Sequence, residues 1–351
     1  MTEFIEMRFR NRPADGLLDG YFESAEILGR VVVPKIKILV VRVHVDAHGT
    51  RLRALAELAD KLWYWRIDRK YTKDETRGAE MFRLICKPNA VSEQGGEEHG
   101  TEYDTSSTCA VCGAGRMQTS ELVLDLRRLP KKGGFATTLS DEPVVSQQTA
   151  EILLDHKLTG FSLRPVRHRS SKFDGPLTLS TVPSGRQLIE RGALVGIRHP
   201  SAAFSLWMSR KENEDLFYKA MAEGAMRFER LASKRPLPVW YQIVSSGQPV
   251  SLSSATQFGL NPLDHDAEGK YRCPFGHTEG WSVLSEAFVE RSTWDGSDYC
   301  VTTRLYGQHA GLHYARPLVL MSRKMREALT QARVPGVTCE VAHLVNSNNV
   351  E

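Results

Sequence analysis

Two short motifs constrain the fold of this chain more than any other feature. They read Cys109-Ala-Val-Cys112-Gly113 and Cys273-Pro-Phe-Gly-His277. Zinc favours four ligands in a tetrahedron, and thiolates and imidazoles are common donors. Each motif offers two such donors from one turn, and its glycine relieves the steric cost of that turn. We therefore predict a zinc site whose ligands are Cys109, Cys112, Cys273 and His277.

Three thiolates and one imidazole fill the tetrahedron and leave no open position for water. Such a ligand set predicts a structural metal rather than a catalytic one. Two alternatives stay open, namely redox chemistry by the Cys-x-x-Cys pair and thiols without a ligand. A redox pair usually starts a helix, whereas Cys112 is followed by Gly-Ala-Gly, a poor helix start.

The remaining cysteines are Cys86, Cys300 and Cys339, each alone in an apolar or mixed segment. Six cysteines among 351 residues are too few for a disulfide scaffold. We expect these three to be small core residues.

Composition narrows the class of protein. The chain is long enough for two domains, and its apolar fraction of 41% is ordinary for a globular protein. A net charge of +4 is too small to indicate a nucleic-acid binder by itself. No segment approaches the roughly 20 apolar residues that cross a membrane, and the first residues lack a signal-peptide core. We expect a cytoplasmic protein without a membrane partner.

Residues 1–100 are expected to form an α/β region that ends in a polar linker. The β-branched run from Val31 to Val45 predicts one or two strands, with a bulge or turn between them. Leucines at helical spacing predict a helix over Thr50–Trp65, and Met81–Cys86 is a strand candidate. Lys87–Thr108 is polar, which predicts an exposed or disordered linker.

Two pairs of segments indicate an internal repeat. Gly115–Glu121 matches Gly280–Glu286, and the same shift in residue number carries Cys112 onto His277. Val145–Leu163 matches Met321–Cys339 at a larger shift. The change of offset requires an eleven-residue insertion in the second copy, which we place near Trp294-Asp295-Gly296.

Each copy predicts the same local structure. Ser146 and Ser322 suit a helix N-cap, and Gly160 and Gly336 suit the turn between helix and strand. We predict an α+β protein in which two related zinc-knuckle/strand/helix/strand halves share one zinc site. The predicted regions are the α/β extension with its linker at 1–100, the first half at 101–168, a central insertion at 169–270 and the second half at 271–351. Within the insertion we expect a helix over Asp215–Leu231 and a strand over Trp240–Val244.

Two other groups of residues are weaker candidates for sites. His44, Asp46 and His48 alternate at a strand end and could bind a metal, although surface residues there would look the same. A basic cluster suits an anion or RNA patch, but a solvated loop explains it as well; its members are Arg164, Arg167, His168, Arg169 and Lys172. No motif names a catalytic nucleophile or base.

With its repeat and its knuckles, the chain resembles the double-CXXCG motif proteins, a paralogous group typical of myxobacteria. Some members of that group are similar to immunity proteins that protect a cell against a kin-directed toxin. The resemblance covers residues 105–168 and 270–345. The second knuckle departs from the pattern, because His277 stands where a second Cys-x-x-Cys-Gly would have a cysteine. The resemblance implies zinc, and it implies a toxin as partner.

Three functions compete at this point. The first is a zinc-stabilised protein-binding module, such as an immunity protein that neutralises a cognate toxin. The second is a nucleic-acid-associated zinc protein that uses the basic cluster together with Trp63, Tyr64 and Trp65. The third is an enzyme with an unrecognised site, for which His44, Asp46 and His48 would be the place to look.

Overall fold

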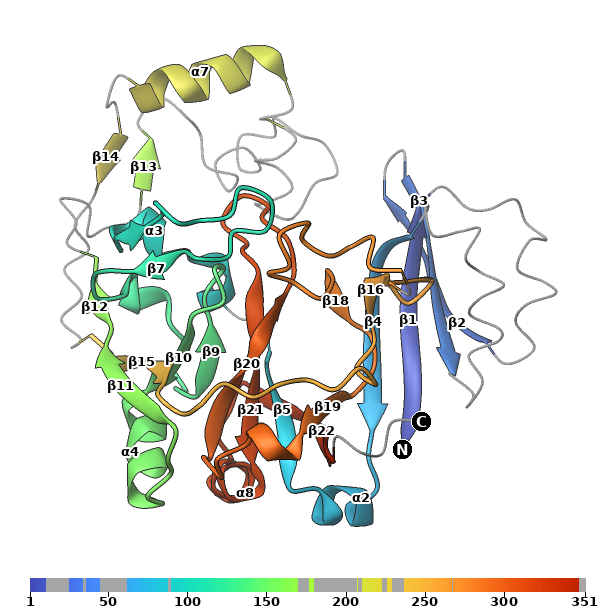
Figure 1. Ribbon diagram of the computed structural model, residues 1–351. Helices are drawn as coiled ribbons and strands as arrows, with labels where there is room; N and C mark the ends of the chain where they lie inside the picture. The colour runs from blue at the N-terminus through green and yellow to red at the C-terminus, as the bar shows by residue number, and fades with distance from the viewer. Residues whose placement is uncertain are drawn as a thin grey trace. The chain divides into compact units, whose positions relative to one another are not determined.

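The computed structural model describes residues 1–10, 25–33, 36–44, 62–87, 90–169, 177–179, 207, 210–222, 226–228, 237–266 and 268–346. The chain divides into two compact units. Unit 1 comprises Met1–Arg169 with Pro238–Glu351, and unit 2 comprises Ser170–Leu237. Strands dominate the described residues, which contain five short α-helices, so the fold is α+β (Figure 1).

The N-terminal sheet has four antiparallel strands in the order β2-β3-β1-β4. They are β1 (Thr2–Arg10), β2 (Ala25–Val33), β3 (Ile36–His44) and β4 (Leu62–Lys70). Ile5, Met7 and Phe9 of β1 are buried, as an alternating strand requires. The strands predicted after Val31 are confirmed.

The helix predicted over Thr50–Trp65 is wrong from Leu62 onward, and residues 50–61 lie outside the described part. Aromatic residues follow Leu62 and favour a strand, and β1 offers them an antiparallel partner, so the pairing of β4 overrides the leucine spacing. The strand predicted at Met81–Cys86 is confirmed as β5. It follows α2 (Lys73–Gly78), whose capping box joins Thr72 and Glu75.

The linker predicted over Lys87–Thr108 is also wrong for most of its length. The segment forms η2 (Ala90–Glu93), α3 (Gly96–His99) and β6 (Tyr103–Asp104), and β6 pairs with β7 (Met117–Gln118). Val91 and Gln94 are fully buried. The side-chain oxygen of Gln94 accepts a hydrogen bond from Asp125 N at 2.8 Å, which ties this buried polar residue to the neighbouring turn. Composition alone does not distinguish a buried polar residue that has a hydrogen-bond partner from a polar residue in solvent.

A second sheet has the strand order β11-β15-β10-β9, and every neighbouring pair in it is antiparallel. Its elements are β9 (Phe135–Thr137), β10 (Pro143–Ser146), β11 (Phe161–Pro165) and β15 (Trp240–Ser245), with α4 (Gln147–Asp155) between β10 and β11. Beyond β11, β12 (Arg167–His168) pairs in parallel with β8 (Val123–Leu124), which leads into η3 (Leu126–Arg128).

A third sheet has the order β19-β22-β5-β21-β20. Its other elements are β19 (Ala287–Glu290), β20 (Tyr299–Tyr306), β21 (Arg316–Ser322) and β22 (Val337–Val345), with α8 (Arg323–Gln331) between β21 and β22. β5 therefore lies at the centre of a sheet formed by the C-terminal region (Figure 1). Residues 1–100 were predicted to form a separate extension. Because β5 lies within that range and pairs with β21 and β22, these residues are not an independent region. Three short strands and one 3-10 turn complete this region, namely β16 (Phe258–Asn261), β17 (Asp264–His265), β18 (Ser282–Val283) and η4 (Arg291–Thr293).

The two segments predicted to repeat have the same secondary structure. In each, a strand ends at a serine whose side chain caps the following helix, Ser146 for α4 and Ser322 for α8. Each helix is followed by a glycine at positive φ, +88° at Gly160 and +84° at Gly336, and then by a strand. The local prediction for Val145–Leu163 and Met321–Cys339 is confirmed.

One apolar core joins the second and third sheets. Leu153 of α4 and Leu329 of α8 lie in the same buried cluster as Val145 and Met321, from the strands that precede the helices. The shared core explains why two sheets far apart in sequence form a single unit.

Unit 2 contains α7 (Lys211–Ala222), and β13 (Leu177–Leu179) pairs with β14 (Met226–Phe228). The helix predicted over Asp215–Leu231 starts earlier and ends at Ala222, because a strand begins at Met226. Unit 2 also ends at Leu237 rather than at residue 270. The strand predicted at Trp240–Val244 is confirmed as β15, and it belongs to unit 1. No helix of the described part is long and apolar enough to cross a membrane.

Candidate metal centre

The first knuckle is a tight turn that packs against a tyrosine. Cys109 N donates to Ala114 O at 2.7 Å, and Gly113 N donates to Cys109 O at 2.8 Å. Gly113 has a φ of +76°, and a Cβ there would lie 2.5 Å from a ring carbon of Tyr314. Only glycine suits both the backbone conformation and the contact.

The second knuckle closes in a comparable way. Gly276 N donates to Cys273 O at 2.8 Å, and Cys273 N donates to Thr278 Oγ1 at 2.9 Å. Gly276 has a φ of +75°, close to that of Gly113. The glycine predicted to relieve each turn does so by adopting a left-handed conformation.

Both knuckles are attached to the end of the β20–β21 hairpin. Glu279 N donates to Leu305 O at 2.9 Å, and the guanidinium of Arg304 donates to Gly276 O. On the other side, Ala315 N donates to Cys112 O at 2.9 Å. One hairpin thus holds two motifs that are far apart in the sequence.

The four predicted ligands come together in one cluster, with all four donor atoms within 4.8 Å of one another. Cys109 Sγ lies 3.7 Å from Cys273 Sγ, and His277 Nδ1 lies 3.6 Å from the sulfurs of Cys112 and Cys273. Zn–S bonds of about 2.3 Å and Zn–N bonds of about 2.0–2.1 Å give tetrahedral edges of about 3.8 Å and about 3.6 Å. These three separations therefore match the edges of a tetrahedral zinc site.

Burial of the cluster favours a metal over free thiols. The three cysteines are buried, with exposed fractions of 9%, 2% and 5% for Cys109, Cys112 and Cys273, whereas His277 is exposed. Burial raises the pKa of Cys112 to about 12, and the backbone N–H groups of Cys112 and Val111 lower the pKa of Cys109 to about 6. A bound cation would stabilise the thiolate form of all three sulfurs.

The redox alternative fits less well. All six cysteines are free thiols. The Cys109–Cys112 pair lies in a turn, and no helix follows it. The helix N-terminus that typically activates a redox pair is therefore missing from this motif.

The other cysteines are core residues, as predicted. Cys300 is fully buried, and burial raises its pKa to about 12. Cys86 is partly buried against the shared core, and burial raises its pKa to about 12 as well. Cys339 packs against the same core from β22.

The weaker candidates receive little support. His44 ends β3, while Asp46 and His48 lie outside the described residues. In the basic cluster, Arg167 pairs with Glu121 at 3.3 Å and Arg169 pairs with Asp125 at 3.2 Å; Lys172 is not described.

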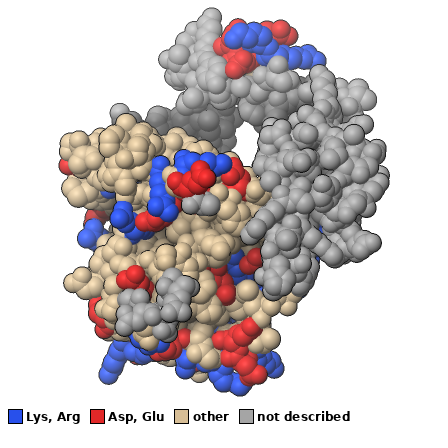
Figure 2. All heavy atoms as spheres, turned by 45° about the vertical axis from the view of Figure 1, so that its right-hand side comes forward, with Lys and Arg blue, Asp and Glu red and all other residues tan. Residues whose placement is uncertain are grey.

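The basic cluster runs along two strands rather than a solvated loop. Arg164 is exposed on β11 and Arg167 lies on β12. On the face that Figure 2 shows, basic and acidic side chains are mixed. Within the basic cluster itself, Arg167 and Arg169 each have an acidic partner, whereas a phosphate-binding surface would gather basic residues alone.

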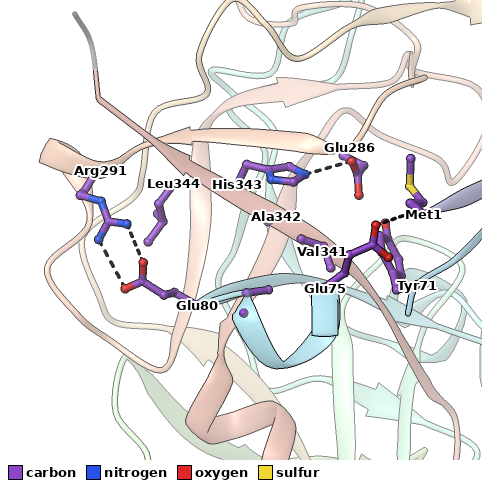
Figure 3. Close-up of a pocket in the computed structure, with 12 residues that line it drawn as sticks. Met1, Tyr71, Glu75, Glu80, Glu286, Arg291, Val341, Ala342, His343 and Leu344 are labelled. Atoms are coloured by element: carbon purple, nitrogen blue, oxygen red, sulfur yellow. Dashed lines mark hydrogen bonds and ion pairs between the residues drawn. The ribbon is translucent and has the colours of Figure 1, made fainter. Parts of the chain in front are cut away.

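A pocket of about 290 Å³ beside β22 contains one candidate acid–base pair, in which His343 points toward Glu286 (Figure 3). His343 Nε2 lies 2.9 Å from Glu286 Oε2. Glu286 directly precedes β19, the parallel partner of the strand that carries His343. In the two-stranded sheet of β8 and β12, Glu121 and Arg167 lie beside a parallel strand pair in a similar way and form an ion pair. The recurrence of such a cross-strand pair beside two parallel strand pairs favours a structural role for His343 and Glu286.

Sequence reasoning missed the support that the hairpin gives to the metal cluster. Ten residues separate Phe135 from Ser146, but 22 separate Tyr299 from Ser322, so the β20–β21 hairpin is longer than the β9–β10 hairpin. The eleven-residue insertion expected near Trp294–Gly296 stays a prediction. The changed offset between the repeated segments was a signal of added chain, but it did not locate Tyr314 at the first knuckle.

Comparisons of this chain with protein-family models, with curated proteins and with solved structures gave no match.

Proposed function

We propose that this protein is a zinc-stabilised protein-binding module in which two related halves share one zinc site. The observation that carries the proposal is the cluster of three sulfurs and one imidazole nitrogen at tetrahedral separations. Thiolate and imidazole donors in such an arrangement suit zinc.

The role proposed for the metal is structural. Four protein ligands fill the tetrahedron, so the ion has no position left at which to activate water. Bound zinc would instead join the turn at Cys109–Gly113 to the turn at Cys273–His277, and the free energy of metal binding would add to the stability of the fold.

Hydrogen bonds outside the knuckles support the proposal that the halves are related. Ser120 Oγ accepts from Glu102 N at 2.8 Å, and Ser285 Oγ accepts from Gln257 N at 2.8 Å. These serines occupy matching positions in the repeated segments around them. Thr101 Oγ1 accepts from Val123 N, and Thr256 Oγ1 accepts from Phe288 N, each at 2.9 Å. Val123 and Phe288 are separated by the same shift in residue number as the two serines.

Exposed apolar residues on the knuckles support a protein as the partner. Val111 is 49% exposed and Phe275 is 68% exposed. Because the ligands of the two knuckles lie within 4.8 Å of one another, these two loops are neighbours. Aromatic and apolar side chains on a rigid surface are typical of protein interfaces. The resemblance to double-CXXCG proteins makes a toxin the proposed partner, with this chain as its immunity protein in the reducing cytoplasm.

The test is recovery of the partner from the native host with tagged full-length protein. We expect one dominant protein in stoichiometric amount, retained at moderate salt. Phe275→Asp should lose that protein and keep its metal, because Phe275 is exposed, whereas Met117→Asp, at a 57% exposed position outside the knuckle loops, should keep both. Nucleic acid recovered instead of protein, with binding that weakens steeply as salt rises, would contradict the proposal.

A further inference from the structure

The central strands of the two helix-bearing sheets come from unexpected places in the chain. β5 precedes the first knuckle, but it pairs with β21 and β22, which follow the second knuckle. β15 precedes the second knuckle, but it pairs with β10 and β11, which follow the first. All four pairings are antiparallel.

The two central strands occupy the same register in their sheets. The capping serine before each helix is paired with the first residue of the central strand, Ser322 with Met81 and Ser146 with Trp240. The first residue of the strand after each helix is paired with the last residue of the central strand, Val337 with Cys86 and Phe161 with Ser245.

The hydrogen bonds that follow the central strands agree as well. Lys87 N, just after β5, donates to Gly336 O at 2.8 Å, and Ser246 N, just after β15, donates to Gly160 O at 2.9 Å. β5 and β15 are therefore equivalent strands that differ in the half from which they come.

Two further bonds cross between the halves in both directions. Phe135 N, at the start of β9, donates to Pro335 O at 3.0 Å, and Tyr299 N, at the start of β20, donates to Thr159 O at 3.0 Å. Each acceptor directly precedes the glycine that follows a helix, so the same contact is made twice, once in each direction.

We infer that the two halves have exchanged their first strands. We also infer that the strand which completes each sheet can come from the same half of a second copy of this chain. In this arrangement each half begins with its central strand, at residues 81 and 240, and gives that strand to the other half. Exchange of an identical element is a common way for two copies of a chain to associate. The inference rests on the related halves proposed above, but not on the identity of any external partner.

The gap between the strands flanking each helix is the interaction surface. Without β5, the facing edges of β21 and β22 would expose unpaired backbone N–H and C=O groups in a buried sheet, which is costly. Only a strand with a buried apolar face in this register fills the gap. Unit 2 joins the halves in the chain, so pairing within one chain is independent of protein concentration, whereas pairing between two copies is not. A single chain therefore pairs with itself at low concentration and can pair with a second copy at high concentration.

Two full-length variants test this inference. One carries Cys109→Ser with Cys112→Ser, and the other carries Cys273→Ser with His277→Ala, so each keeps one intact knuckle. The two are unfolded, mixed, refolded together at high concentration with zinc, and separated by size. We expect a dimer with one zinc per two chains, because the intact knuckles meet when halves pair between chains. Each variant refolded alone should bind no zinc, and a zinc-free mixture would overturn the inference.

A second measurement avoids variants that lack metal. A protease site is inserted into unit 2 of the otherwise unchanged chain, and the folded protein is cut there. We expect both fragments to elute together without denaturant and to separate in denaturant. Fragments that separate in native buffer while each stays folded would contradict the exchange. This measurement needs no zinc signal, so its failure can be told apart from a failure of the zinc proposal.

Discussion

Cys109→Ser is expected to remove the bound zinc and to lower the free energy of unfolding by at least about 3 kcal/mol. A serine hydroxyl is a poor zinc ligand. Loss of the Cys109 thiolate leaves three donors, of which Cys112 and Cys273 are buried thiols. Cys273→Ser, in the other half, should have an effect of the same size, because both residues serve one site. Metal content and chemical denaturation of the purified variants measure the two effects.

His277→Cys is the matched control for these variants. It replaces the imidazole by a fourth thiolate at the position that corresponds to Cys112, and four thiolates also satisfy zinc. We expect this variant to keep one zinc and most of its stability. Metal loss in His277→Cys together with metal retention in Cys109→Ser would contradict the proposed ligand set.

Gly160→Ala and Gly336→Ala are expected to destabilise the protein by about 3–5 kcal/mol each. Both glycines have a φ in the left-handed region, +88° and +84°. A Cβ at Gly160 would overlap the carbonyl oxygen of Tyr299, and one at Gly336 would overlap that of Phe135. Each of those oxygens belongs to the backbone of the other sheet, so it cannot move without separating the two sheets. Thermal and chemical unfolding would measure the loss.

Gly296→Ala separates the two contributions. Gly296 has a φ of +87°, like the other two, but no atom lies within 4 Å of a Cβ built there. This variant should lose only the conformational term, about 1–2 kcal/mol. If all three variants lose the same free energy, the close approach between the halves does not contribute.

The metal cluster was predictable from sequence because its chemistry is local. Cys109 with Cys112, and Cys273 with His277, each lie within one turn, and each turn has a glycine that identifies it. Joining the two turns required only the preference of zinc for four ligands. The tetrahedral separations between the sulfurs and Nδ1 agree with that prediction.

The repeated helix-and-strand segments were predictable for a similar reason. A capping serine and a glycine after the helix act within a few residues, so the residues around Ser146 and Ser322 specify their own local structure. Their register within the sheets depends on residues far away, and the sequence pattern did not contain it.

The wrong predictions have one cause in common: each depends on a contact between residues that are distant in the sequence. Leu62 begins a strand because β1 pairs with it, although its spacing from the preceding leucines suits a helix. Gln94 is polar but fully buried, and Asp125 N donates a hydrogen bond to its side-chain oxygen. The sequence pattern placed the strand Met81–Cys86 in the N-terminal region. In the structure this strand completes a sheet whose other strands begin at Ala287. Partners that are distant in the sequence decide each case, and a local pattern does not contain them.

Zinc content of the freshly purified, unchelated protein tests the central claim most directly. The proposal predicts one zinc per chain by elemental analysis, and X-ray absorption at the zinc edge should give three sulfur neighbours at about 2.3 Å and one nitrogen at about 2.0–2.1 Å. Protein that is folded but free of metal, or zinc bound with oxygen neighbours and fewer than three sulfurs, would contradict a shared site made by Cys109, Cys112, Cys273 and His277.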